Sequence, residues 1–186
     1  MHAGSNTAQE TEILRLKELA RAEEERTSEW KQKYKMQSES FKENFAWPRQ
    51  DSITAPYGDL RTYNGKKQSQ HYGTDIRGAT GTPVYAANAG TVVMSRDAYA
   101  SGNTVLVHHG AGLYTAYFHL SAMDVKDGER VERGQLLGKV GATGRVTGPH
   151  LHWGVKVDDM WVDGETLLKL DFTGEPAPAV SQRYKE

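Results

Sequence analysis

The histidines of this chain are concentrated in one part of the sequence, at spacings suited to binding a metal ion. Of the seven histidines, all except His2 lie in the stretch from His71 to His152. His71 and Asp75 are four residues apart, and His150 and His152 are two apart. Side chains on an extended chain repeat every two residues, so each pair can face one side of its strand and converge on one point. The spacing therefore predicts a metal site.

Zinc fits the ligands that this sequence offers. The chain contains no cysteine, which excludes disulfides and thiolate zinc sites and leaves histidines and carboxylates as the available ligands. A catalytic zinc uses three protein ligands and a water molecule, and it accepts imidazole nitrogen and carboxylate oxygen at about 2.0–2.2 Å. Two histidines and one aspartate match that count. Such an ion would polarise a carbonyl group and lower the pKa of its water towards about 7, which makes hydrolysis feasible at neutral pH.

The other histidines divide into two groups. His119, in a further predicted strand, is available as an acid, a base or an oxyanion stabiliser. His108 and His109 are adjacent, so on a strand they would face opposite sides, and we interpret them as structural or solvated. A non-haem iron oxygenase shares the ligand set of two histidines and a carboxylate. It normally spaces its first pair as His-x-Asp, so the spacing of His71 and Asp75 disfavours that alternative.

A β-rich domain has to position these side chains. Between residues 45 and 170 glycines are frequent, and short β-branched runs alternate with turns such as Lys126-Asp-Gly128. This pattern is typical of antiparallel strands and predicts little helix. The predicted strands are Pro83 to Ala86, Gly90 to Met94, Thr104 to His108 and Tyr114 to His119. The fold class that follows is mainly β, an antiparallel sheet or sandwich.

The flanking segments differ in composition. Residues 1–44 are rich in Glu, Lys, Arg, Leu and Ala, which favours an N-terminal α-helix, and Pro48 ends any helix there. The apolar stripe of this segment is interrupted by Glu23 and Thr27, so a solvated helix is favoured over self-association through a coiled coil. Residues 171–186, with Pro176 and Pro178, are predicted to be a flexible tail.

Charge and hydropathy exclude two classes of partner. Lys and Arg total 23 against 24 for Asp and Glu, and the formal net charge of -1 gives no long-range attraction to nucleic acid or anionic lipid. No apolar run approaches the roughly 18 residues that span a bilayer, and Met1 to Thr7 lacks the basic and apolar regions of a secretory signal. We therefore expect no nucleic-acid partner and no direct membrane insertion.

Several short motifs occur in order between Trp47 and Leu168. They include His71-Tyr-Gly-Thr-Asp75, Gly81-Thr-Pro-Val-Tyr-Ala-Ala87, Gly102-Asn-Thr-Val-Leu-Val-His108, Tyr117-Phe-His119-Leu-Ser121 and Thr147-Gly-Pro-His-Leu-His-Trp153. This series resembles the lysostaphin-type, or LytM-like, zinc metallopeptidases of bacterial cell walls. The resemblance implies one zinc ion per chain, bound by His71, Asp75 and His152. It also implies that His119 and His150 act beside the metal, without deciding which of the two is the general base.

The resemblance further implies an activity and a location. The family hydrolyses peptide stems or cross-bridges of peptidoglycan, at glycyl or D-alanyl bonds, in the periplasm, in the cell envelope or outside the cell. It also uses a tyrosine upstream of the first ligand, for which Tyr63 is the candidate here. Non-catalytic relatives that activate cell-wall amidases have lost several site residues, whereas this chain has lost none. An active enzyme is therefore favoured over a silent module that binds cell wall or activates an amidase, although a segment before Glu43 that occludes the groove would also silence it.

Overall fold

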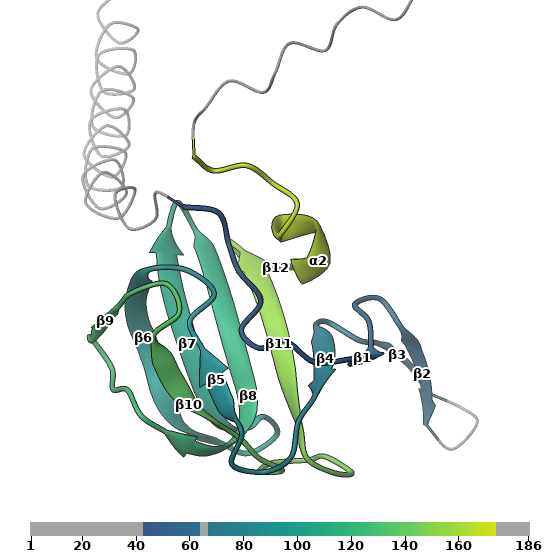
Figure 1. Cartoon of the computed structure of the whole chain (residues 1–186). Coiled ribbons are helices and arrows are strands. Elements are labelled where there is room, and N and C mark those ends of the chain that lie inside the picture. The colour runs from purple at the N-terminus through teal and green to yellow at the C-terminus, as the bar shows by residue number, and fades with distance from the viewer. Residues whose placement is uncertain (1–42, 64–66, 174–186) are drawn as a thin grey trace, which may run out of the picture. The chain divides into compact units, whose positions relative to one another are not determined.

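A computed structural model describes residues 43–63 and 67–173 of the chain (Figure 1). The strands are β1 (Ile53–Ala55), β2 (Leu60–Tyr63), β3 (Lys67–Gln70), β4 (Thr74–Arg77), β5 (Pro83–Tyr85), β6 (Gly90–Ala98), β7 (Gly102–Gly110), β8 (Leu113–Met123), β9 (Arg130–Val131), β10 (Leu136–Val140), β11 (His150–Val157) and β12 (Met160–Val162). Helix α2 (Gly164–Leu167) follows them and is the only helix in the described ranges. The predicted mainly β class, with little helix, is confirmed for this part of the chain.

The strands pair into a ten-stranded sheet and a separate two-stranded one. The main path runs β1-β4-β11-β8-β7-β6-β9; β12 joins β11, and β10 pairs with both β5 and β8. The small sheet consists of β2 and β3. Every pairing is antiparallel. Figure 1 shows the long strands β6, β7, β8 and β11 side by side, with β4 and β1 following β11 at one edge.

Strand β11 contributes side chains both to the hydrophobic core and to the candidate site. Leu151, Trp153 and Val155 are almost completely buried in the hydrophobic core. His150 and His152 alternate with them and are only partly buried. Successive side chains of a strand point to opposite faces, so the apolar set packs against the core and fixes the histidines on the other face.

Parts of the predicted organisation fall outside the described residues. The predicted N-terminal helical segment, residues 1–44, overlaps them only at positions 43 and 44, and the predicted tail, residues 171–186, only at positions 171–173. The domain boundaries and self-association through the N-terminal helix therefore stay predictions. Within the described ranges, no helix is long and apolar enough to cross a membrane.

Candidate metal centre and active site

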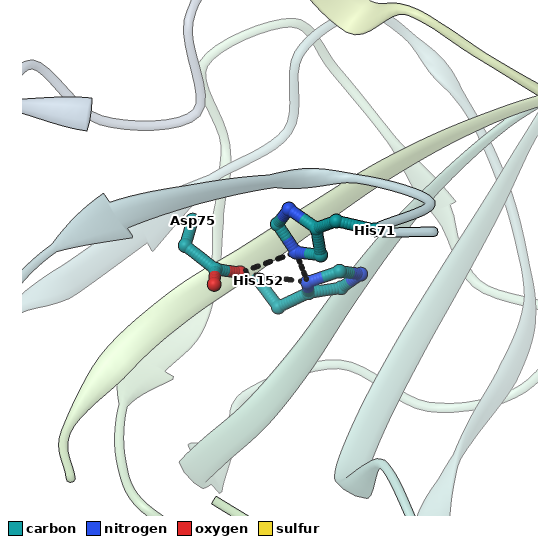
Figure 2. Close-up of side chains that lie close together, drawn as sticks. All are labelled: His71, Asp75 and His152. Carbon is teal, nitrogen blue, oxygen red and sulfur yellow. Dashed lines mark hydrogen bonds and ion pairs between the residues drawn. The ribbon is translucent and has the colours of Figure 1, made fainter. Parts of the chain in front are cut away.

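His71, Asp75 and His152 converge where β4 pairs with β11 (Figure 2). Asp75 on β4 lies opposite His152 on β11 in the antiparallel register, and His71 lies just before β4. His71 Nε2 is 3.0 Å from Asp75 Oδ1 and 2.9 Å from His152 Nδ1, and His152 Nδ1 is 2.7 Å from Asp75 Oδ1. The structure thus brings together the three residues that the sequence analysis assigned to zinc, and their ligand atoms form a group able to hold a metal ion.

The hydrogen bonds and pKa shifts of these three side chains favour binding of a cation. His71 Nδ1 lies 2.9 Å from the carbonyl oxygen of Pro56, which can only accept, so Nδ1 carries a hydrogen and Nε2 is the ring nitrogen that faces Asp75 and His152. Burial acts to raise the pKa of Asp75, but its hydrogen bonds with His152 and His71 outweigh burial and hold that pKa well below its usual range. Burial lowers the pKa of His152 and favours its neutral ring. Neutral imidazoles and an ionised carboxylate are the forms in which these residues bind zinc, so the donor set fits that ion.

Arg61 holds the outer oxygen of Asp75. Its Nη2 donates to Asp75 Oδ2 over 2.7 Å, and the other oxygen, Oδ1, faces the two histidines. A hydrogen bond of this kind fixes the orientation of a metal-binding carboxylate. Arg61 could not be identified from the sequence, because it lies on β2, in the separate small sheet, and no spacing rule connects it to Asp75.

Gly73 allows the segment before β4 to approach β11 closely. A Cβ atom at this position would lie 2.5 Å from His152 Nε2 and 2.8 Å from the carbonyl oxygen of Trp153. Both distances are too short for a real side chain, so a larger residue would have to displace His152 or the strand. The His71-Tyr-Gly-Thr-Asp75 motif therefore needs its glycine for space.

His119 on β8 and His150 on β11 lie beside this group. Their ring centroids are 5.2 Å apart, and the ring of His119 is 6.0 Å from that of His152. Nδ1 of His119 and of His150 lies 2.9 Å from the carbonyl oxygens of Thr143 and Gly148, respectively. Since a carbonyl cannot donate, each Nδ1 carries the hydrogen and each Nε2 is left with a lone pair. His150 Nε2 is 3.6 Å from Asp75 Oδ1.

A β-bulge directs His119. Val105 on β7 pairs with Tyr117, whereas Asn103 pairs with Leu120, so β8 contains an additional residue at this point. His119 has a φ of 62°, in the left-handed region that non-glycine residues rarely adopt. Bulges of this kind redirect a side chain, and unusual backbone angles are found at functional sites. Burial lowers the pKa of His119 to about 4, so its ring is neutral at neutral pH.

The remaining candidates from the sequence have different outcomes. Tyr63 ends β2, but its side chain is outside the described part, and its role stays a prediction. His108 is buried and stacks on Tyr114 with ring centroids 4.4 Å apart. His109 is fully buried and hydrogen-bonded through both nitrogens. These contacts support the structural interpretation of His108 and His109 and not the solvated one.

The site lies along an open groove. One cavity of about 620 Å³ is lined by residues that include Tyr72, Phe118 and Trp161. A second cavity of about 500 Å³ is lined mainly by residues before β4 and in the segment that leads into β11. The two cavities share four lining residues, which are Arg61, His119, Arg145 and His152. The groove therefore passes the candidate metal centre and provides room for an extended ligand.

Comparisons with known proteins agree with this site. Residues 69–164 match the model of Peptidase family M23. The peptidoglycan DD-endopeptidase ShyA of Vibrio cholerae is 50% identical over 88 residues, which make up 47% of this chain and 20% of that protein. The crystal structure of a zinc containing peptidase from Vibrio cholerae aligns with a TM-score of 0.64 and 34% identity over 70% of this chain and 41% of that one.

A second solved structure covers almost its whole length. The catalytic domain of the antimicrobial peptidase lysostaphin from Staphylococcus simulans aligns with a TM-score of 0.58 and 33% identity over 64% of this chain and 93% of that one. The chain spans 20% of the length of ShyA and 22% of that of the related ShyC of Vibrio cholerae. The family match nevertheless covers more than half of the 186 residues and includes His71, Asp75 and His152. The chain belongs to peptidase family M23.

Proposed function

We propose that this chain is a zinc-dependent endopeptidase that hydrolyses peptide cross-links or stems of bacterial peptidoglycan. The observation that carries the proposal is the convergence of His71 Nε2, His152 Nδ1 and Asp75 Oδ1 within 3.0 Å of one another in a peptidase-family domain. The similarity to ShyA, a peptidoglycan DD-endopeptidase, supports peptidoglycan as the substrate. A peptidoglycan substrate places the activity in the periplasm, in the cell envelope or outside the cell.

One zinc ion per chain would be held by His71, Asp75 and His152. When bound, zinc supplies a Lewis acid that polarises a peptide carbonyl and lowers the pKa of a water molecule to about 7. Arg61 keeps the Asp75 carboxylate oriented through its second oxygen. Gly73 keeps His152 in place by leaving its ring the space that it occupies.

His119 and His150 perform the proton transfers. Each has its Nδ1 hydrogen committed to a backbone carbonyl, so Nε2 is the atom that can accept a proton from the attacking water. Once protonated, the same Nε2 is a donor that can deliver the proton to the leaving amine. As an imidazolium, the other histidine would donate a hydrogen bond from Nε2 to the developing oxyanion, and Tyr63 is the proposed additional donor to that oxygen.

The alternative function is a silent module that binds cell wall or activates an amidase. Such a module has no need of a carboxylate and two imidazoles that converge on one point, with two further oriented histidines beside them. The presence of all these groups in one groove supports an enzyme.

Digestion of purified peptidoglycan tests the proposal. The full chain, after its zinc content has been measured, is incubated with peptidoglycan with and without a chelator, and the released fragments are identified by mass spectrometry. We expect peptide-bond cleavage that the chelator abolishes and added zinc restores. A protein that binds zinc and peptidoglycan but releases no fragments would establish the silent module instead. The masses of the fragments would also identify the bond as glycyl or D-alanyl.

A further inference from the structure

The groove beside the candidate metal centre is positively charged, although the formal net charge of the chain is -1. Arg61 and Arg145 line both cavities, and Arg77 lines the second. Among the described residues that line them, Asp75 is the only carboxylate. Charges of one sign in a cleft concentrate the local field, so this groove attracts anionic ligands.

Two of the three arginines already have a carboxylate nearby. Arg61 pairs with Asp75 over 2.7 Å. Arg77 lies close enough to Asp51 to help lower the pKa of that carboxyl group. Arg145 is exposed, and within the described part of the chain no carboxylate forms an ion pair with it. Its charge is therefore available to a ligand.

An aromatic ring orients the Arg145 side chain without neutralising it. The guanidinium carbon lies 5.9 Å from the ring centroid of Tyr99, within the range of a cation–π interaction. Tyr99 is itself 88% exposed and Arg145 is exposed, so the pair lies at the surface and is not part of the core.

Arg145 belongs to the same loop that orients His119, between β10 and β11. The Arg145 N–H donates to the carbonyl oxygen of Ala100 over 2.9 Å. Thr143, two residues earlier, accepts the Nδ1 hydrogen of His119 on its carbonyl oxygen. Between them, Gly144 has a φ of 77°, and a Cβ atom there would lie 2.4 Å from a backbone nitrogen of the facing loop. Arg145 is thus fixed relative to a proposed catalytic histidine.

We propose that Arg145 binds a free carboxylate of the peptide substrate close to the scissile bond and thereby selects acidic peptides over uncharged ones. This inference rests on the proposed peptidase function and specifies the substrate class of that site. A guanidinium group matches a carboxylate with two parallel N–H···O bonds, which lysine cannot reproduce. Arg145 is a specificity-determining residue in this account, whereas Arg61, already bound to Asp75, positions a metal ligand.

The test uses two series of synthetic cross-linked peptides, one with a single glycyl and one with a single D-alanyl peptide bond to be cleaved. In each series one peptide has all its carboxyl groups free, and in each of the others a single carboxyl group is converted to a carboxamide. The values of kcat and KM are measured with the zinc-loaded full chain, and calorimetry gives the Kd of each peptide. The variants are Arg145→Gln, Arg145→Lys and the matched control Arg130→Gln, since Arg130 is exposed and lines neither cavity.

We expect one of the carboxyl groups to matter most, with its conversion to carboxamide lowering kcat/KM about 10- to 100-fold, mainly through KM. In Arg145→Gln the ratio of kcat/KM for the free-carboxyl peptide to that for the carboxamide peptide should approach one. Arg145→Lys should recover only part of the wild-type ratio, and Arg130→Gln should have the same ratio as the wild type. Circular dichroism of each variant checks that it is folded.

The outcomes separate the inference from the proposed function. Equal cleavage of all the peptides by the wild type, or a preference unchanged in Arg145→Gln, would overturn the role of Arg145 and leave the peptidase function standing. Binding that favours the free carboxylate and depends on Arg145, but without cleavage, would support the inference and reject the peptidase function. The absence of both cleavage and preferential binding would overturn both.

Discussion

His109 and His119 lie on the neighbouring strands β7 and β8, and their rings have one hydrogen bond of the same kind. Nδ1 of His109 donates to the carbonyl oxygen of Ala89 over 2.8 Å, and Nδ1 of His119 donates to that of Thr143 over 2.9 Å. Burial lowers the pKa of both to about 4. The two rings differ in what surrounds Nε2. The pKa therefore does not distinguish the structural histidine from the candidate catalytic one, whereas the hydrogen bonding of Nε2 does.

Nε2 of His109 is bound within the core. It lies 2.7 Å from Thr115 Oγ1, which lies 2.9 Å from the Tyr117 hydroxyl, and that hydroxyl accepts from the Ala87 N–H over 2.8 Å. This sequence of bonds fixes the direction of each hydrogen, because His109 Nε2 has to accept. Nε2 of His119 has no hydrogen-bond partner within the described part of the chain, and its residue lines the groove. A buried imidazole that is hydrogen-bonded through both nitrogens stabilises the fold. An imidazole that lines a groove with its Nε2 unbonded is available to accept a proton.

Replacing a metal ligand should have the largest effect. We expect His152→Ala to lose both bound zinc and peptidoglycan hydrolysis, because it removes one of the three converging ligand atoms. Zinc content is measured by elemental analysis and activity by fragment release. Retention of about one zinc per chain by this variant would contradict the proposed ligand set.

Replacing His119 should separate activity from metal binding. His119→Ala is expected to keep its zinc and to lose hydrolysis about 100- to 10,000-fold, the usual contribution of a general acid or base. His109→Gln serves as the comparison, and we expect its hydrolytic activity per folded molecule to equal that of the wild type. Loss of zinc from His119→Ala would show that this residue is a ligand and would remove the contrast between the two histidines.

The stability of the metal-free protein should depend on pH through His109. Its folded pKa of about 4 lies below the ordinary histidine value of 6.5, so as the pH falls the unfolded state takes up a proton first. The stabilisation is therefore complete above about pH 6.5 and is lost as the pH falls towards 4, by about 3 kcal/mol. Urea unfolding with a chelator present measures this loss.

The matched variant for that experiment is His109→Gln. It should be less stable at pH 7, because it leaves core hydrogen bonds unmade, and its stability should vary less between pH 6.5 and 4. An identical pH dependence in the variant and the wild type would show that His109 is not responsible.

Gly73→Ala should have the smallest of these effects. The added Cβ would crowd His152, and we expect zinc affinity to fall about 10- to 100-fold, as it does when the support of a metal ligand is disturbed. Competition with a zinc indicator measures the affinity. Gly134→Ala is the matched control, because a Cβ at Gly134 would meet no atom within 4 Å although its φ is 78°. Equal zinc affinities of the two variants would argue against a steric role for Gly73.

The sequence predicted the elements that depend on local pattern. The spacing of two residues placed His150 and His152 on one face of a strand, and the resemblance to a known family assigned His71 and Asp75 to the same ion as His152. The direction of His119 could not be predicted, because it depends on a bulge set by the register of β7 against β8. The contact of Arg61 with Asp75 and that of Thr143 with His119 could not be predicted either. Both join segments far apart in the chain through single hydrogen bonds.

X-ray absorption at the zinc edge distinguishes a metal ligand from a catalytic histidine, because it counts the imidazole rings bound to the ion in the wild-type protein and in His119→Ala. We expect two imidazole nitrogens together with oxygen ligands at about 2.0–2.2 Å, and the same spectrum in both proteins. Three or more imidazoles in the wild type, with one lost in His119→Ala, would rule out His71, Asp75 and His152 as the full set of protein ligands, and a protein that binds no zinc would rule out the metal centre.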